Sequence, residues 1–328
     1  MTSRFALDPT FAPGSMRGMT PTPEHPGLVN WLLILSLGIV WGTAFMSISL
    51  ALEGYGPWTV AAMRTTLGGL ALLAAGRIMG QPLSTIPGRK GWAAVTATGI
   101  TSAALPFVLL AWGLQHIPSA FAGVAMGAVP LLVLPLVYLF SPEEGIGPKR
   151  IAGVALGFVG LAILIGPGAF EGGGDLTGLG RLACLGAAAC YGISSVLTRR
   201  APKMPPIAFA AGTLLFASVI LLPIAIVADG WPQGPTLTAT AALLYLALFP
   251  TGLAALVRVR VITTAGSIFM SLVSYMVPIW SVIFGIALLG EDLPGQLFFA
   301  LALILAGIGL SQWRSLRAGL FRRKTEGN

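Results

Sequence analysis

Ten runs of about 20 apolar residues constrain this chain more than any other feature of its sequence. They cover residues 30–52, 57–78, 91–115, 119–140, 150–168, 180–198, 206–228, 238–257, 267–289 and 294–313. A helix of about 20 apolar residues is long enough to cross the hydrocarbon core of a bilayer. The connections are short, and only 9% of the residues are charged, against about 25% in soluble domains. The sequence therefore predicts an all-α membrane protein with ten transmembrane helices.

The basic residues predict the orientation of these helices. If the N-terminus is placed in the cytoplasm, 17 of the 19 Lys and Arg residues fall in cytoplasmic segments. Cytoplasmic connections of membrane proteins carry such an excess, so both termini are expected inside. We expect a flexible cytoplasmic tail over residues 1–29 and a basic cytoplasmic tail over residues 314–328. The formal net charge of +8 then reflects topology, and no nucleic-acid partner is expected.

Similar residues recur at a nearly constant spacing, which indicates an internal repeat. The matched pairs at a spacing of 148 residues are Ser119 with Ser267, Pro130 with Pro278, and Glu143 with Glu291; Trp41-Gly42 matches Tyr191-Gly192 at 150. They predict two five-helix repeats, residues 30–168 and 169–313. An odd number of helices turns the second repeat upside down relative to the first. Inverted repeats are typical of secondary transporters, with a solute site near the midplane between them. We therefore expect a central cavity.

Hydroxyl side chains form single-face stripes on four of the runs. The stripes occupy positions 36, 43 and 47; 98, 101 and 102; 194, 195 and 198; and 267, 271, 274 and 281. By contrast, residues 150–168 and 294–310 contain no Ser or Thr. Polar stripes favour contact with other helices or a wet cavity, so runs 1, 3, 4, 6, 8 and 9 are predicted to surround the pathway. The alternative is that these hydroxyls bond their own backbone or a neighbouring helix.

The candidate cavity-lining residues combine these hydroxyls with aromatic side chains inside the runs. They are Trp41, Thr43, Ser47, Thr101, Trp112, Tyr191, Ser194, Ser195, Ser271, Ser274 and Tyr275. A Tyr or Trp at depth needs a partner for its polar atom. Trp41 and Tyr191, at matched positions, would form the walls of a pocket for a partly apolar solute, or would simply pack helices together.

One charge and several prolines lie well inside the runs. Arg64 lies about two turns from the outer end of the second helix. It would bind a solute carboxylate, or it would snorkel outward or tie carbonyls of adjacent helices; the sequence favours the structural role. Mid-run prolines remove a backbone bond and tend to kink helices, so they would act as gates or as fixed bends. They are Pro106, Pro130, Pro135, Pro250 and Pro278.

Several chemistries lack the residues that they need. No Asp or Glu lies deep in a run, and the sequence contains no P-loop, HExxH motif or Cys/His cluster. The two cysteines, Cys184 and Cys190, lie six residues apart and on different faces of one helix, so neither a disulfide nor a metal site is expected. We predict a protein that is not an enzyme, has no cofactor or metal, and depends on a solute or ion gradient.

A set of short motifs resembles a known family. They are WGTAF at 41–45, Pro57 followed by Arg64, AWGLQHIPSA at 111–120, Pro130, Glu143 and Gly290-Glu291. In their order they are similar to the EamA-type repeats of the drug/metabolite transporter superfamily over nearly all of residues 30–313, although Tyr-Gly replaces Trp-Gly in the second half. Within the superfamily the chain looks most like the YddG-type amino acid exporters.

The resemblance implies a ten-helix basket with a central cavity in a bacterial inner membrane. It also implies export of amino acids, aromatic or other neutral ones, and of related metabolites by alternating access. We expect a small-molecule substrate, a lipid bilayer around the protein, and a monomer or weak homodimer.

Three other functions remain open. An exporter of cationic drugs would be expected to hold a buried carboxylate, and a nucleotide-sugar or sugar-phosphate antiporter would be expected to hold deep Lys/Arg pairs. A membrane enzyme or lipid scramblase would need a catalytic constellation that the sequence does not show.

Overall fold

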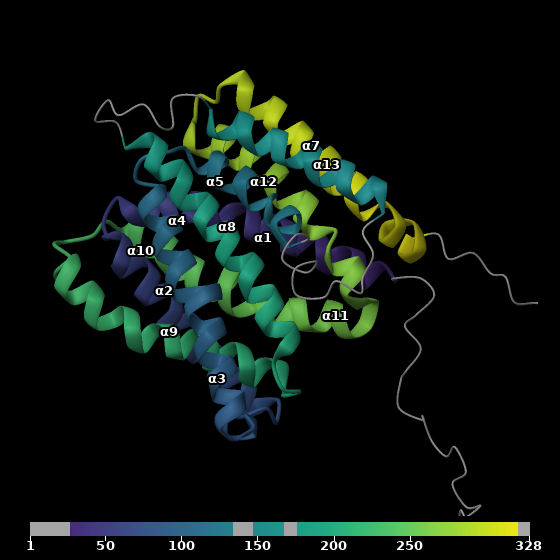
Figure 1. The fold of residues 1–328 in the computed structure, drawn as a ribbon. Helices are drawn as coiled ribbons and strands as arrows, with labels where there is room; N and C mark the ends of the chain where they lie inside the picture. Colours follow the sequence, from purple (N-terminus) through teal and green to yellow (C-terminus); the bar gives the residue numbers. More distant parts are fainter. Residues whose placement is uncertain (1–26, 134–146, 167–175, 321–328) are drawn as a thin grey trace, which may run out of the picture.

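The computed structural model describes residues 27–133, 147–166 and 176–320, and within these ranges every regular element is a helix (Figure 1). Eight helices are long and apolar enough to cross a membrane: Leu28–Leu52, Pro57–Ile78, Gly88–Gly113, Pro148–Ile165, Thr177–Arg200, Pro206–Ala228, Leu237–Gly266 and Gly295–Trp313. Two shorter apolar helices, Ser119–Val133 and Val273–Leu289, lie at the fourth and ninth predicted runs. Most of the predicted tails, Pro135 and Glu143 lie outside the described residues.

The named elements follow the predicted runs in order. They are α1 (Leu28–Leu52), α2 (Pro57–Ile78), η1 (Leu83–Thr85), α3 (Gly88–Gly99), η2 (Ile100–Ala104), α4 (Leu105–Gly113), α5 (Ser119–Met126), α7 (Pro148–Ile165), α8 (Thr177–Arg200), α9 (Pro206–Ala228), α10 (Leu237–Leu246), η4 (Ala247–Leu253), α11 (Ala254–Met270), α12 (Val273–Leu289) and α13 (Gly295–Leu320). Both η2 and η4 are π-helical and lie inside longer helices, the third and eighth along the chain.

Two predicted boundaries are wrong. The eighth run was expected to end at residue 257, before Arg258 and Arg260, but the helix continues through both arginines to Gly266. Arginine is a good helix former, so a charge alone does not end a helix, whereas Gly266 adopts a φ of 87° that leaves the helical region. The ninth run was expected to be continuous over residues 267–289, but a turn at residues 271–272 divides it.

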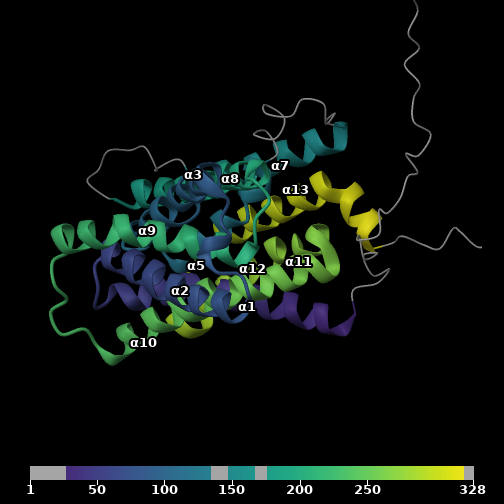
Figure 2. The ribbon, with the colours of Figure 1, turned by 90° about the horizontal axis from the view of Figure 1, so that it is seen from below.

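Helices at matching places in the two halves pack against each other. The most extensive pairs are α2 with α9 and α7 with α13, and α5 packs on α12 in the same way. In addition, α1 packs on α10 and α12, while α8 packs on α4 and α5. Figures 1 and 2 show α7 and α13 side by side along one edge of the molecule, with α2 and α9 toward the opposite edge.

Two helix N-termini are capped by side chains from the partner helix of the α2–α9 pair. An Asp229 carboxylate oxygen (Oδ2) accepts a hydrogen bond of 2.7 Å from the backbone N–H of Thr59 in α2. Conversely, Oε1 of Gln81 accepts one of 3.1 Å from the N–H of Ile207 in α9. Thr59 and Ile207 are 148 residues apart, and so are Gln81 and Asp229. Reciprocal contacts at one spacing are the pattern that two halves related by a two-fold axis produce.

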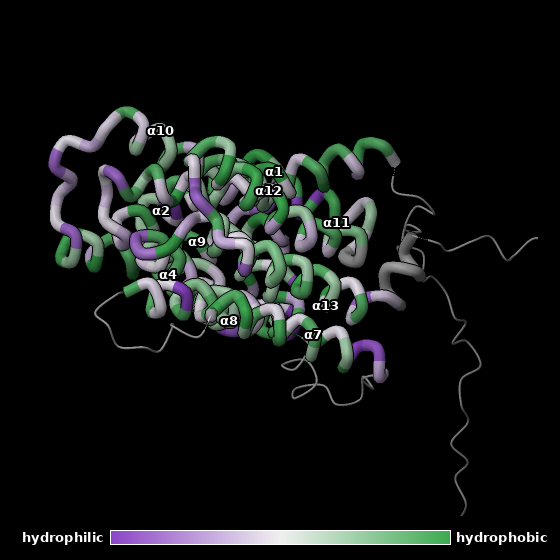
Figure 3. Tube along the Cα trace, turned by 90° about the horizontal axis from the view of Figure 1, so that it is seen from above, coloured by the Kyte–Doolittle hydropathy of each residue, from purple (hydrophilic) through white to green (hydrophobic). Residues whose placement is uncertain are grey.

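The helix ends gather at two opposite ends of the molecule. We call the end that holds the links between α1 and α2, between α4 and α5, and between α12 and α13 the outer end, following the predicted orientation. At the opposite, inner end, Oγ1 of Thr264 donates to Oδ1 of Asn30 over 2.8 Å. Figure 3 shows hydrophobic residues along the helices and hydrophilic ones in several connecting segments.

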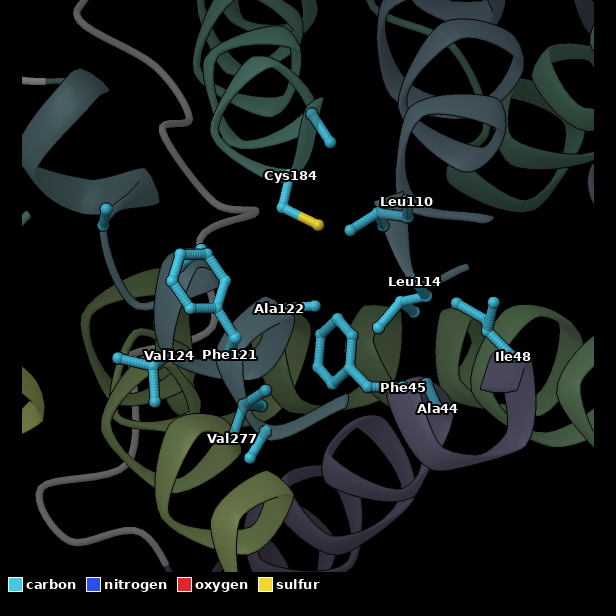
Figure 4. Packing of buried hydrophobic residues seen from close by; sticks show 14 of the residues in the cluster. Ala44, Phe45, Ile48, Leu110, Leu114, Phe121, Ala122, Val124, Cys184 and Val277 are labelled. Atoms are coloured by element: carbon cyan, nitrogen blue, oxygen red, sulfur yellow. The ribbon is translucent and has the colours of Figure 1, made fainter. Parts of the chain in front are cut away.

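Buried apolar side chains fill the space between five helices in the outer half. Phe45 of α1, Leu110 of α4, Phe121 of α5 and Cys184 of α8 belong to one cluster, which also includes Val277 of α12 (Figure 4). All five are at most 8% exposed. The outer half of this bundle is therefore held together by close apolar packing.

Candidate functional site

The π-helical segment η4 brings two of the predicted site residues together. The indole Nε1 of Trp41 in α1 donates a hydrogen bond of 3.0 Å to the backbone carbonyl of Pro250. Next to it, Nε of Arg64 in α2 donates one of 2.8 Å to Oγ1 of Thr251. Side chains from the first half of the chain are thereby attached to one irregular turn of the second half.

The sequence explains why this turn is irregular. Pro250 has no N–H, so the carbonyl of Leu246, four residues earlier, receives no helical hydrogen bond from it. The hydroxyl of Thr251 donates to that carbonyl over 2.9 Å and at the same time accepts the bond from Arg64. A π-helical turn inside an α-helix is frequently found at a functional site.

Arg64 is a buried cation whose described surroundings contain no carboxylate. The residue is 8% exposed, and its guanidinium carbon lies 3.8 Å from the centre of the Phe107 ring, a cation–π contact. Tyr191 lies close enough to interact with it electrostatically. Within the part of the chain that the structure describes, Nε is the only nitrogen of the guanidinium with a hydrogen-bond acceptor. The structure thus gathers Trp41, Arg64 and Tyr191 around η4 and α4.

The predicted hydroxyls fall into two groups. Thr43 donates to the carbonyl of Val40 and also shares a hydrogen bond of 2.7 Å with Oη of Tyr245 in α10. Ser47 and Thr101 bond carbonyls of their own helices, as the alternative interpretation holds. By contrast, Ser194 and Ser195 of α8 have no hydrogen-bond partner among the described residues, and Ser194 is only 5% exposed.

Other predicted site residues lie elsewhere. Trp112 lies in the last turn of α4, at the outer end, with its ring 4.8 Å from that of His116. Near the break between α11 and α12, Oγ of Ser271 donates to Oε1 of Gln312 in α13. Ser274 and Tyr275 follow in the first turn of α12, and Oη of Tyr275 is buried without a hydrogen-bond partner in the described part of the chain. These residues do not contact the turn at η4.

The predicted gating prolines occupy different local structures. Pro250 lies within η4, and Pro106 follows η2 by two residues. Pro130 follows a turn at residues 127–128, whereas Pro278 lies inside the helical stretch of α12. The backbone irregularities near the first three were not predicted in kind, because a sequence marks a proline but not the π-helical turn that accommodates it.

Three contributors to this arrangement were missed. They are Phe107, Tyr245 and Thr251. Tyr245 is an aromatic residue with a polar atom inside a run, so the rule that selected Trp41 and Tyr191 would also have found it. Thr251 directly follows a mid-run proline, which is a readable signal for a hydroxyl that satisfies the freed carbonyl.

The Gly290-Glu291 motif has a defined position at the outer end. Gly290 ends α12 with a φ of 64°, and the chain then places the Glu291 carboxylate at the N-terminus of α5. Oε1 accepts from the N–H of Ser119 over 2.5 Å, and Oε2 from that of Ala120 over 3.1 Å. A carboxylate at a helix N-terminus satisfies amides that have no intrahelical partner.

Within the described ranges, no group of three or more His, Cys, Asp or Glu residues is close enough to hold a metal ion. Cys184 and Cys190 are both buried and not bonded to each other.

The chain is similar to known transporters. The sequence model of the EamA-like transporter family matches twice, over residues 29–166 and 178–312. A WAT1-related chloroplast protein of Arabidopsis thaliana, At3g02690, is 28% identical over 86% of this chain and 69% of its own length. A probable terminal-alkyne amino-acid exporter of Streptantibioticus cattleyicolor is 26% identical over 87% of this chain and 94% of its own. One solved crystal structure, 24% identical, shares the fold with a TM-score of 0.63 over 88% of this chain and 99% of its own.

Proposed function

Because the chain belongs to the EamA-like transporter family, we propose that it exports amino acids or closely related metabolites. The coarse part of this statement, that the protein is a membrane transporter and not an enzyme, follows from the family. The amino acid is a proposal, to which the similarity to a probable amino-acid exporter lends support. We expect aromatic or other neutral amino acids, since aromatic and hydroxyl side chains predominate among the candidate site residues.

The observation that carries the proposal is the set of contacts at η4. Trp41 and Arg64 come from the first half of the chain and bind Pro250 and Thr251 of the second. A solute site between the two halves is the arrangement found in transporters with inverted repeats. Indole and phenol rings suit an apolar side chain, and a guanidinium suits a carboxylate.

Transport would proceed by alternating access between two inverted five-helix repeats. The reciprocal caps at Thr59 and Ile207 support the inverted duplication, as does the double match of the family's sequence model. The apolar cluster around Phe45 would close the outer half and would have to separate when the solute leaves. We place both termini in the cytoplasm of a bacterial cell and the helices in its inner membrane.

The test is counterflow in proteoliposomes against a panel of neutral amino acids, cationic drugs and sugar phosphates, with and without an uncoupler. Trp41→Ala and Tyr191→Ala should lower amino-acid counterflow, and Trp313→Ala, which changes an exposed residue, should not. All variants must elute as folded protein in detergent.

The outcomes separate the alternatives. Signal only for cationic drugs or for sugar phosphates would replace the amino acid by that class. No signal for any amino acid from folded protein would refute the substrate proposed here, and wild-type rates in both aromatic variants would remove those residues from the site.

A further inference from the structure

Arg64 carries more hydrogen-bonding capacity than the described protein uses. A guanidinium has five N–H donors, and only the one on Nε has an acceptor among the described residues. The Phe107 ring covers one face of the group at 3.8 Å, and the nearest interacting ionisable group is the phenol of Tyr191, which is not an anion at neutral pH. A buried charge inside a membrane protein is costly unless an opposite charge or several acceptors compensate it.

The charge also has no counterpart in the second repeat. The position 148 residues after Arg64 is Gly212, which is buried and whose added Cβ would meet only Ile86 and Val95 at 3.2 Å and beyond. By contrast, the helix caps of the α2–α9 pair occur in both halves at that spacing. A feature needed to hold the repeated scaffold together would be expected in both halves. Arg64 belongs to one half only, so its charge serves something other than the scaffold.

The position of the group is fixed by the contacts that it does make. The bond from Nε to Thr251 and the stacking on Phe107 hold the guanidinium between α2, α4 and η4. The two terminal nitrogens have no described acceptor, and they are oriented before any solute arrives. A planar guanidinium with two free amino groups matches a carboxylate, which accepts two parallel hydrogen bonds.

We propose that the terminal nitrogens of Arg64 bind the carboxylate of the transported solute and select solutes that carry one. The proposal rests on the proposed function and makes it more specific. Trp41 and Tyr191 then contact the remainder of the solute. Because the same guanidinium holds Thr251, the carboxylate binds directly beside the π-helical turn.

The test compares solutes that differ only at the carboxylate. Counterflow is measured in proteoliposomes with L-phenylalanine, L-phenylalaninamide and phenethylamine as the probes. The wild type should move phenylalanine at least tenfold faster than either of the other two, since a hydrogen bond to a charged group changes affinity about 10- to 100-fold. Arg64→Gln should remove that preference, and Arg64→Lys should reduce it because a lysine cannot form the paired bonds.

Thr251→Val is the matched control. It removes the acceptor of Nε and the cap on the Leu246 carbonyl but keeps the charge, so the overall rate may fall while the preference for the acid over the amide persists. Size-exclusion profiles in detergent show which variants are folded. If Arg64→Gln does not fold, the comparison of Arg64→Lys with Thr251→Val replaces it.

The results decide between two failures. A wild type that moves phenylalanine and its amide equally well overturns the carboxylate site, and so does a folded Arg64→Gln or Arg64→Lys protein that keeps the wild-type preference. Loss of the preference in Thr251→Val as well would make Arg64 a structural support of η4 and would overturn the proposal. A wild type that moves none of the probes refutes the proposed function, and the carboxylate site fails with it.

Discussion

The Glu291 carboxylate gives a prediction whose size can be worked out from its contacts. It bonds the backbone amides of Ser119 and Ala120 at the start of α5, and its own N–H donates to the carbonyl of Gly285. Ser119 is 1% exposed, so water cannot readily replace the carboxylate there. Glu291→Ala leaves both amides without this partner, whereas Glu291→Gln keeps one acceptor oxygen and loses the charge.

The expected loss of stability follows from the two bonds. Leaving a buried donor unsatisfied costs about 1–3 kcal/mol, and loss of a helix N-cap typically costs about 1 kcal/mol. We therefore expect about 2–3 kcal/mol for Glu291→Ala and about 1 kcal/mol for Glu291→Gln. In a chain of this size, about 1 kcal/mol lowers Tm by about 2 °C, so Glu291→Ala should unfold about 4–6 °C earlier than the wild type.

The assay is thermal unfolding of purified protein in detergent, followed by tryptophan fluorescence. Asp292→Asn is the matched control, because Asp292 is the next residue, carries the same charge and is exposed. Its Tm should stay within about 1 °C of the wild type, as for most surface substitutions. Equal Tm values for Glu291→Ala and Asp292→Asn would refute the capping role.

Two further predictions concern the packing between helices. Gly307→Ala should lower Tm strongly, because the new Cβ would lie 2.6 Å from backbone atoms of α7, including the Gly153 carbonyl; Gly309→Ala, with nothing within 4 Å, should be neutral or slightly stabilising. Asp229→Ala should cost about 1 kcal/mol through the lost cap on Thr59, and a Tm unchanged from wild type would contradict that cap.

The sequence predicts the helices well for a physical reason. A run of about 20 apolar residues has few alternatives to a membrane-embedded helix, so its existence can be read directly. Its ends are less certain, because charges were taken as boundaries at Arg258 and Arg260. In the structure the helix includes both arginines and ends at Gly266, where the backbone conformation itself changes. A glycine with a positive φ marks an end more reliably than a charge does.

The site was predicted residue by residue, not as an assembly. Trp41, Arg64 and Pro250 were each selected because each breaks the apolar pattern of its run. Their meeting could not be predicted, because it depends on how α1, α2 and η4 cross. The helix caps were hidden for another reason: Gln81 and Asp229 differ in residue type, so a search for matching residues does not pair them, although both present an oxygen to a helix N-terminus.

The contacts of α2 and α9 suggest which part of the molecule stays rigid. Asp229 joins the two helices at the outer end, Gln81 joins them at the inner end, and between these caps the hydroxyls of Thr66 and Ser218 lie 2.6 Å apart. Helices held together at both ends and in the middle move as one body. The π-helical turns η2 and η4 lie in other helices, so bending during transport is expected there.

A cross-link between α2 and α9 tests this division. Cysteines placed at both positions by Thr66→Cys and Ser218→Cys should form a disulfide on oxidation, and the oxidised transporter should keep the counterflow rate of the reduced one. Wild-type protein treated with the same oxidant is the control, since its own Cys184 and Cys190 are buried. Loss of counterflow on oxidation of the double variant alone, restored by reduction, would show that α2 and α9 must separate. The moving boundary would then run through this pair and not through the π-helical turns.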